Sequence, residues 1–158
     1  MHVFRIAKKR YAADLSGAGA RMAGGRWNFK GVPIVYTSES RALAFCEFFI
    51  HVSPALIPTN LKITTIFIPD QMQPVTIDKK ELPPGWRSMT SSYRSAQMGT
   101  DRQQSNASLL LRVPSVVIPD EHNILINPMH PDIHLVEIES MDDFHIEDRY
   151  LELIKNYS

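Results

Sequence analysis

The amino-acid sequence predicts an α+β protein, in which a strand-rich sheet is combined with one buried helix. From residue 61 onward, several short runs rich in Ile, Val, Leu and Thr are separated by Pro, Asp, Gly or Asn, which is typical of strands. One clear helical pattern precedes them, over residues 38–52. Strands and helices do not alternate along the chain, so a parallel sheet built from βαβ units is not expected.

The size and composition of the chain are those of a folded domain. With 158 residues, of which 44% are hydrophobic and 22% charged, residues 1–158 are expected to form a single domain with its own core. The 17 basic and 17 acidic side chains cancel, which argues against binding nucleic acid through a basic face. A near-neutral surface also does little to oppose association with a partner protein.

The expected location is the cytoplasm. Cys46 is the single cysteine and lies in an apolar run, so no intrachain disulfide can form and a reducing compartment is the simplest interpretation. The first residues have no apolar segment of signal-peptide length, and no stretch approaches about 20 apolar residues. No membrane association is therefore expected.

The elements expected in the first part of the chain are a strand, a glycine-rich stretch, a second strand and the helix. In order, they occupy residues 3–6, residues 12–25 (a loop or a short helix), residues 33–37 and residues 38–52. The helix has Ser or Thr before its apolar run, Glu39 in its first turn and an end shortly before Pro54.

The second part is expected to be mostly strands. The strand-like runs lie at residues 61–69, 74–78, 108–119, 123–127 and 133–139. Residues 81–107 are polar and irregular, which fits either a long loop or a helix that the pattern does not locate. Residues 144–157 are expected to contain a short C-terminal helix.

Glu47 lies in the middle of the predicted helix, in the run ALAFCEFFI. At about 100° per residue, Phe45 and Phe49 fall on the side opposite Glu47, whereas Leu43 and His51 fall near it. Two interpretations follow. Glu47 belongs either to a solvated stripe of a half-buried helix or to a cleft, where a carboxylate can face a developing positive charge.

The segment MAGGRWN, residues 22–28, is the least ordinary stretch of the chain. Arg21 and Arg26 flank a glycine pair, and glycine lets a ligand approach the backbone closely. The planar guanidinium fork suits phosphate oxygens, so two arginines at this spacing can grip a pyrophosphate. A glycine turn with two solvated arginines is the simpler alternative.

Tyr36 and Ser115 are further candidates, and each also has a structural interpretation. Tyr36 ends the strand over residues 33–37, where its ring can stack on a base or pyridinium or serve only for packing. Ser115 follows a proline in a strand-like run, a place where serine is usually structural. The histidines show no metal-ligand spacing, and no GxSxG element of a serine hydrolase is present. We therefore expect no metal site.

Taken in order, these residues resemble the RES domain, a family named for an Arg, a Glu and a Ser. The stretches ARMAGGRWNFKGVPIVYTSESRALAFCE and LLLRVPSVVIPDEHNILINPMHPD resemble its two signatures, and FHIEDRYL is similar to its C-terminal element. The resemblance covers nearly the whole chain except residues 81–107. It assigns the family positions to Arg26, Tyr36, Glu47 and Ser115, with Arg21 and Asn127 at further recurring positions.

The resemblance implies a fold like the ADP-ribosyltransferase core and a role as the toxin of a bacterial toxin–antitoxin pair. Characterised members of the family destroy cellular NAD by phosphorolysis or hydrolysis. NAD is then a substrate, inorganic phosphate a candidate co-substrate, and no prosthetic group is implied. The implied partner is an Xre-type helix-turn-helix antitoxin, in a complex that is an oligomer and that contacts DNA only through the antitoxin.

The resemblance also implies roles for the site residues. Glu47 would face the positive charge that builds on the ribose carbon as nicotinamide leaves. Arg26 would hold the NAD phosphates or an attacking phosphate, and Tyr36 would orient the nicotinamide ribose. Ser115 would bond the nicotinamide amide or the ribose. Arg21 and Asn127 are expected to contribute to NAD binding.

Three other functions stay open from the sequence. A protein-modifying ADP-ribosyltransferase often carries a Glu/Gln-x-Glu pair, but Phe45 stands two residues before Glu47. A non-catalytic NAD-binding or partner-binding module is disfavoured because all four family residues are present. A nucleic-acid binder would use arginines of the irregular segment, namely Arg87, Arg94 and Arg102, which are more simply solvated.

Overall fold

The computed structural model describes residues 1–52, 58–88 and 92–156, and within them one mixed seven-stranded sheet has the order β4-β5-β6-β2-β1-β3-β7. The strands are β1 (His2–Lys8), β2 (Val35–Ser38), β3 (Leu61–Phe67), β4 (Val75–Thr76), β5 (Leu110–Pro114), β6 (His122–Ile126) and β7 (Glu137–Phe144). The helices are α1 (Ala18–Ala23), α2 (Arg41–Ile50), α3 (Ser92–Ser105) and α4 (Asp148–Asn156). Only the β4–β5 pair is parallel among these strands. The predicted α+β class is confirmed.

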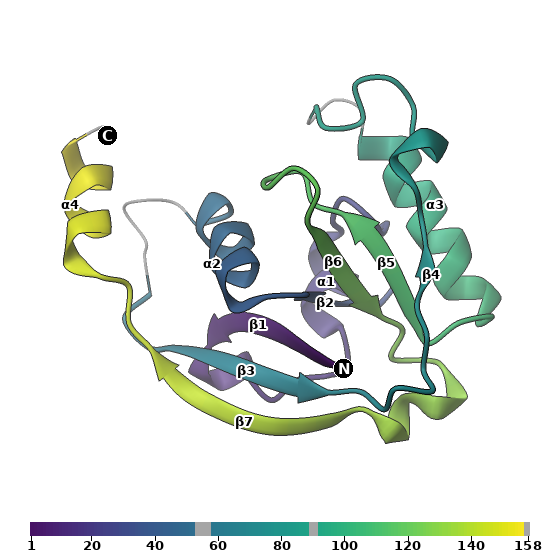
Figure 1. Ribbon diagram of the computed structural model, residues 1–158, viewed down its shortest axis with the longest axis horizontal. Coiled ribbons are helices and arrows are strands. Elements are labelled where there is room, and N and C mark those ends of the chain that lie inside the picture. The colour runs from purple at the N-terminus through teal and green to yellow at the C-terminus, as the bar shows by residue number, and fades with distance from the viewer. Residues whose placement is uncertain (53–57, 89–91, 157–158) are drawn as a thin grey trace.

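The half of the sheet that contains β1 and β3 and the half that contains β5 and β6 share one hydrophobic core. Val3 of β1 and Ile66 of β3 belong to the same buried cluster as Ile124 and Ile126 of β6. In Figure 1, β3 and β7 run along the lower side of the molecule, whereas β5 and β6 stand between α2 and α3. Each buried aliphatic side chain contributes about 1.5–3 kcal/mol to folding. This cluster therefore fixes the position of one half of the sheet relative to the other.

The helix α2 packs across β1 and β2 on the opposite side of the sheet from that cluster. The hydroxyl of Ser40 accepts a hydrogen bond from the Leu43 N–H at 3.0 Å, so Ser40 is the N-cap. The prediction of a helix starting at residue 38 was wrong at this end. Ser38 completes β2 and Glu39 precedes the helix instead of lying in its first turn.

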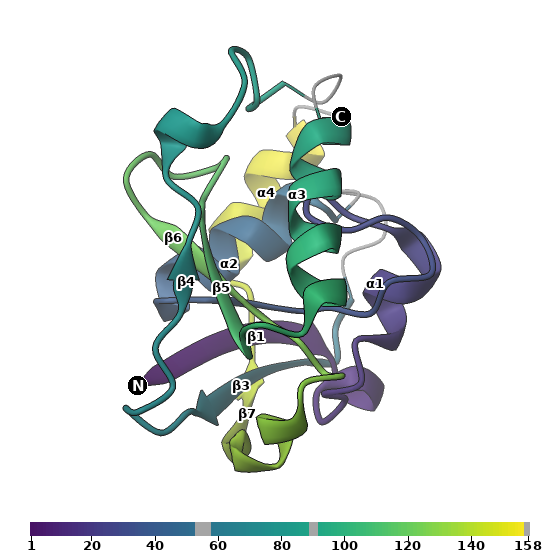
Figure 2. The same ribbon diagram turned by 90° about the vertical axis from the view of Figure 1, so that its right-hand side faces the viewer.

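The C-terminal helix α4 contacts α2 through Tyr150. The ring of Tyr150 contacts the rings of Phe45 and Phe49 at centroid distances of 5.7 and 6.5 Å. In Figure 2, which views the molecule from the side of α3, α2 and α4 lie behind that helix. The predicted C-terminal helix is confirmed, with its start at Asp148 because Phe144 still belongs to β7. The last residue of that predicted segment, 157, lies outside the described residues.

The helix α3 occupies the segment that the sequence left undecided between loop and helix. Its buried residues are small or polar, namely Ser95, Ala96, Gly99, Thr100 and Gln103. A Cβ added to Gly99 would lie 2.0 Å from the carbonyl oxygen of Trp27, so α3 packs its backbone directly on the MAGGRWN segment. Without an apolar stripe, the periodicity that reveals most helices is absent. The expectation of one buried helix was therefore incomplete.

Several strand boundaries differ from the prediction. Residues predicted as a strand at 133–139 begin in a 3-10 helix, Pro131–Leu135, and β7 starts only at Glu137. Pro131 lies at the first position of that turn, where its fixed φ is favourable. The strand predicted at 108–119 ends at Pro114, which places Ser115 in the following loop. The remaining predicted strands correspond to β1, β2, β3, β4 and β6, and α1 lies within residues 12–25.

Candidate active site

The Glu47 carboxylate is held by side chains from two other parts of the sheet. Its Oε1 accepts hydrogen bonds from the Ser115 hydroxyl at 2.8 Å and from Asn123 Nδ2 at 2.6 Å. Glu47 projects from α2, Ser115 follows β5 and Asn123 lies in β6. The half-buried carboxylate is thus part of a polar cluster and does not lie on a freely solvated stripe.

Ser115 is built into a tight turn that directs its hydroxyl at Glu47. Its Oγ accepts hydrogen bonds from the N–H groups of Val117 and Ile118, both at 3.0 Å, and its own N–H donates to the Glu121 carbonyl. The side chain is buried, with a relative exposure of 1%. A serine hydroxyl has one proton, and here it is donated to Glu47. The Ser115 hydroxyl therefore holds the Glu47 carboxylate through a hydrogen bond in this structure.

Tyr36 organises the MAGGRWN segment through its hydroxyl. The hydroxyl accepts the Trp27 N–H at 3.0 Å and donates to Asn28 Oδ1 at 2.8 Å. Burial raises the pKa of Tyr36, so the hydroxyl stays protonated and keeps both bonds. A Cβ added to Gly25 would lie 2.7 Å from this oxygen. The second glycine therefore makes room for Tyr36, whereas Gly24 supplies a left-handed turn with φ of +71°.

Arg26 is held by main-chain carbonyl groups of a distant segment. Its Nη1 donates to the Trp86 carbonyl at 2.7 Å and, at 3.4 Å, to the Ser88 carbonyl. Burial lowers the pKa of Arg26, and the negative charge of Glu47 opposes this effect, so the two side chains interact electrostatically. Arginine remains charged at any physiological pH. A permanent cation therefore lies near enough to the Glu47 carboxylate to interact with it.

Residues 86–88, here called the strap, join the two loops that carry Arg26 and Ser115. Arg26 bonds the strap carbonyls on one side, and Arg87 Nη2 donates to the Val116 carbonyl at 3.1 Å on the other. The Trp86 ring lies 6.5 Å from the Trp27 ring, centroid to centroid, in a tilted arrangement. Arg87, a candidate for binding nucleic acid, is thus turned onto the protein itself.

Asn127 lies at the far end of β6 from Asn123, about 13 Å along the strand at a rise of about 3.3 Å per residue. Its amide donates to the Gln103 carbonyl and to Asn106 Oδ1. Its Oδ1 accepts bonds from Gln103 Nε2 and from the Met129 N–H. These contacts tie the end of α3 to the sheet. The structure thus places Asn127 in a buried structural network away from Glu47.

The structure brings in two residues that the sequence did not single out, Asn123 and Ser38. Asn123 Oδ1 accepts a hydrogen bond from the Ser38 hydroxyl at 2.7 Å. Asparagine is depleted in strands, so its presence inside a strand-like run was an available signal. By contrast, Arg21 is exposed on α1, and no hydrogen bond of its guanidinium is found in the described part of the chain.

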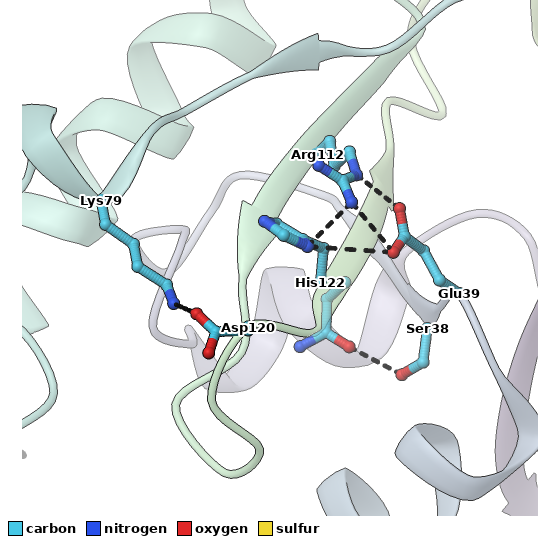
Figure 3. Close-up of polar contacts among 7 residues, drawn as sticks. Ser38, Glu39, Lys79, Arg112, Asp120 and His122 are labelled. Carbon is cyan, nitrogen blue, oxygen red and sulfur yellow. Dashed lines mark hydrogen bonds and ion pairs between the residues drawn. The ribbon is translucent and has the colours of Figure 1, made fainter.

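A second polar cluster lies on the opposite face of the same strands, because side chains alternate between faces. Figure 3 shows the Arg112 guanidinium directed at both the Glu39 carboxylate and the His122 ring. Lys79 pairs with Asp120 beside it. Among the residues that the structure describes, no group of three or more His, Cys, Asp or Glu could hold a metal ion. No helix within the same residues is long and apolar enough to cross a membrane.

These features define an α+β domain in which an arginine and an anchored glutamate share one site. The model of the RES domain family matches residues 2–149, and the chain therefore belongs to the RES domain family. The match spans nearly the whole chain and includes Arg26, Glu47 and Ser115.

Relatives of known description support this assignment. The chain is 44% identical over 123 residues to the Prs ADP-ribosylating toxin of Sphingobium sp. strain YBL2, covering 77% of this chain and 76% of that protein. It is 31% identical over 157 residues to Toxin Res of Photorhabdus laumondii, covering 98% and 100%. It is 34% identical over 131 residues to Toxin Res of Yersinia enterocolitica, covering 82% and 86%.

A solved structure has the same fold. A chain in the crystal structure of the M. tuberculosis MbcT–MbcA toxin–antitoxin complex superposes with a TM-score of 0.66. The superposition covers 98% of this chain and 87% of that chain, at 16% sequence identity. At this level of identity the likeness concerns the fold alone.

Proposed function

We propose that this protein is the toxin of a toxin–antitoxin pair and that it cleaves the nicotinamide–ribose bond of NAD. The observation that carries the proposal is the anchored Glu47 carboxylate, which is held through one oxygen and shares its site with Arg26. Relatives named Toxin Res support the role as a toxin, and the relative named as an ADP-ribosylating toxin supports an enzymatic activity.

The chemistry of the bond fits a fixed carboxylate. Nicotinamide is a cation in NAD and leaves as a neutral molecule, while positive charge builds on the ribose carbon. A carboxylate already held beside that carbon stabilises the transition state without reorganising. Both bonds to Glu47 end on Oε1, which leaves Oε2 to face the ribose.

Arg26 is the residue proposed to hold phosphate oxygens. Arginine has five N–H donors, and strap carbonyls accept from Nη1 at 2.7 and 3.4 Å and from Nη2 at 3.5 Å. The donors that are not directed at the strap can bind a diphosphate or an attacking phosphate. Tyr36 and Ser115 then serve the reaction indirectly, because the hydroxyl protons of both are donated to protein groups. Arg21 and Asn127 are not needed for this mechanism.

The acceptor of ADP-ribose is proposed to be water or inorganic phosphate, so that the reaction depletes cellular NAD. A protein acceptor is the second candidate, and the 44% identity to a relative named as an ADP-ribosylating toxin favours it. Against it, the position two residues before Glu47 holds Phe45, whose ring packs 5.8 Å from that of Phe144. No second carboxylate stands there to activate a protein acceptor.

The bond-cleavage step is tested by Glu47→Gln. Nicotinamide release from NAD by the purified protein is expected to fall about 100-fold or more, because a fixed charge at the transition state is lost. Circular dichroism should report an unchanged fold. The matched control is Glu39→Gln, which alters a glutamate on the opposite face and should keep the rate within about threefold. Wild-type activity in Glu47→Gln would refute the proposal.

The acceptor is identified from the products. NAD is incubated with and without phosphate, and product masses are read by mass spectrometry. ADP-ribose phosphate indicates phosphorolysis and plain ADP-ribose indicates hydrolysis. Label from ADP-ribosyl-labelled NAD that stays on protein indicates the transferase candidate.

We further propose an Xre-type helix-turn-helix antitoxin as partner, in an oligomeric complex of the cytoplasm that reaches DNA only through the antitoxin. Relatives named Toxin Res and the fold shared with a chain of a toxin–antitoxin complex support an antitoxin. Co-expression with the adjacent reading frame should yield a stable complex without NAD-cleaving activity. Full NAD cleavage by the purified complex would contradict this partner.

A further inference from the structure

We propose that Asn123 is a positioning residue that fixes the Glu47 carboxylate, and that Ser38 holds the Asn123 amide in place by donating to its oxygen. The proposal rests on the function proposed above, since it deepens the role of Glu47 in that reaction. Three groups form one chain of hydrogen bonds, in which Ser38 Oγ donates to Asn123 Oδ1 and Asn123 Nδ2 donates to Glu47 Oε1.

The sheet register creates this chain. Ser38 in β2 lies directly opposite Asn123 in the antiparallel strand β6. Directly opposed side chains have Cβ atoms about 4.5–5.5 Å apart, which a serine hydroxyl and a carboxamide can bridge. Glu47 reaches the same point from α2, which packs over β2. Three separate elements therefore meet at the side chain of Asn123.

Glu47 and Ser38 together hold the amide of Asn123 in one orientation. An asparagine side chain has a donor end and an acceptor end, and the two differ little in shape. An ionised carboxylate can only accept, so Glu47 selects the NH₂ end, and the Ser38 hydroxyl, which can donate or accept, donates to the remaining Oδ1. The reversed amide would place its oxygen against the negatively charged Glu47, which is repulsive. Ser38 is 3% exposed, so water has little access to replace this hydroxyl.

The consequence for Glu47 is a fixed carboxylate with one free edge. Ser115 and Asn123 both donate to Oε1, and two donors from different parts of the fold fix the position of that oxygen. Hydrogen bonds to a charged acceptor are among the strongest side-chain bonds in proteins. Oε2 is thereby presented in one orientation. Loss of Asn123 should affect the rate of the chemical step more than the binding of NAD, because Asn123 acts only through Glu47.

Thr37 provides a matched control in the same strand. It is adjacent to Ser38 and also buried, and its hydroxyl donates to the Ile124 carbonyl at 2.6 Å. The Thr37 side chain lies on the opposite face of the sheet, so this bond does not lead to Glu47. Thr37→Val removes a buried hydroxyl of the same strand pair and leaves the chain from Ser38 to Glu47 in place.

The experiment measures nicotinamide release from NAD between pH 5 and pH 9 for Asn123→Ala, Asn123→Asp, Ser38→Ala and Thr37→Val. For Asn123→Ala we expect kcat to fall about tenfold or more with KM for NAD changed less than about threefold, since one charge-assisted bond is lost. Ser38→Ala should show a smaller fall in kcat, again with KM for NAD changed less than about threefold. Thr37→Val should keep both constants, even if it lowers the melting temperature.

Asn123→Asp distinguishes positioning from a structural role. It puts a second carboxylate within hydrogen-bond distance of Glu47, and two such groups tend to share a proton. The acid limb of the pH profile of kcat should therefore move to higher pH, with activity partly recovered on the alkaline side. A wild-type kcat in Asn123→Ala, or an equal loss of kcat in Thr37→Val, would overturn the proposal.

A second readout does not depend on NAD. In protein labelled with ¹⁵N-asparagine, the Asn123 side-chain NH₂ signals should shift in Glu47→Gln and in Ser38→Ala but not in Thr37→Val. Signals that respond in this way would support the chain even if the wild-type protein released no nicotinamide, a result that would refute the proposed function alone. Signals unchanged in both Glu47→Gln and Ser38→Ala would overturn the chain itself.

Discussion

At the scale of single residues, the segment that carries Arg26 owes its shape to close packing around Tyr36. The Tyr36 hydroxyl bonds the Trp27 N–H and Asn28, and Gly25 leaves the space that this hydroxyl occupies. The sequence suggested that the glycines make room for a dinucleotide. In the structure the space beside Gly25 is filled by the Tyr36 hydroxyl, so the glycine shapes the loop that holds Arg26.

This packing predicts an energetic coupling between Gly25 and Tyr36. Gly25→Ala would place its Cβ 2.7 Å from the buried Tyr36 oxygen and should destabilise the protein by about 1–3 kcal/mol. In a Tyr36→Phe background that oxygen is absent, so the same substitution should cost less. Urea unfolding of both single variants and the double variant measures the coupling. Additive free energies, within about 0.5 kcal/mol, would contradict the packing.

His122 predicts a dependence of stability on pH. Arg112 Nη2 approaches His122 Nδ1 at 2.8 Å, and a guanidinium can only donate, so the ring must be neutral to accept. Burial, assisted by the charge of Arg112, lowers the pKa of His122 below its ordinary value of 6.5. The unfolded chain then binds the proton more readily. The contribution of neutral His122 to the free energy of unfolding is complete above about pH 6.5, and it is lost as the pH falls through the lowered pKa of His122 in the folded state.

The matching measurement compares urea unfolding at pH 7.5 and pH 5.5. Wild-type protein should lose more unfolding free energy between these pH values than His122→Gln, which has no ring to protonate. Equal losses in the two proteins would show that His122 does not contribute.

At the scale of elements, the close approach of α3 to the MAGGRWN segment requires a glycine at position 99. Gly99→Ala would bring a Cβ to 2.0 Å from the Trp27 carbonyl oxygen, and this backbone atom cannot move aside without shifting the segment. A loss of unfolding free energy at or above about 3 kcal/mol is expected, at the upper end for overpacking. Chemical denaturation of the purified variant measures it.

Gly19→Ala is the matched control for this prediction. Gly19 lies in α1, and a Cβ added there meets no atom within 4 Å. Alanine favours a helix over glycine by about 0.5–1 kcal/mol, so this variant should be as stable as the wild type or slightly more stable. Equal stability of Gly19→Ala and Gly99→Ala would contradict the packing of α3 described above.

The contrast between α2 and α3 shows what the sequence can predict at this scale. The helix α2 has an apolar run and a serine N-cap, so its pattern was visible and only its start was misplaced. The buried face of α3 is made of small and polar residues such as Gly99 and Thr100, and packing against a backbone leaves no hydrophobic periodicity to detect. Likewise the strand predicted to start at residue 133 starts only at Glu137, because the strand-like pattern begins within the 3-10 helix Pro131–Leu135.

At the scale of the whole molecule, the candidate site is a product of long-range contacts. Glu47 bonds Ser115 across 68 positions of sequence and Asn123 across 76. No local pattern encodes such separations, so the residues could be grouped in advance only through the resemblance to the RES family. That resemblance pointed to residue types, whereas the direction of each hydroxyl and the use of Asn123 emerged only from the folded structure.

The core shared by both halves of the sheet predicts that the molecule unfolds as one cooperative unit. Val3 and Ile66 come from one half, Ile124 and Ile126 from the other, and all four lie in one buried cluster. Loss of either half would therefore expose the core of the other. Such coupling is typical of single domains that unfold without populated intermediates.

The two tryptophans allow this prediction to be tested. Trp27 and Trp86 both lie beside the half of the sheet that contains β5 and β6, since Trp27 packs in a cluster with Val113 and Leu125. Tryptophan fluorescence thus reports on that half, whereas far-ultraviolet circular dichroism reports on the whole sheet. The two signals should give the same midpoint in urea, and Ile66→Ala should shift both together while costing about 2–5 kcal/mol. If Ile66→Ala shifted only the circular dichroism transition, the two halves would be independent and the shared core would not govern stability.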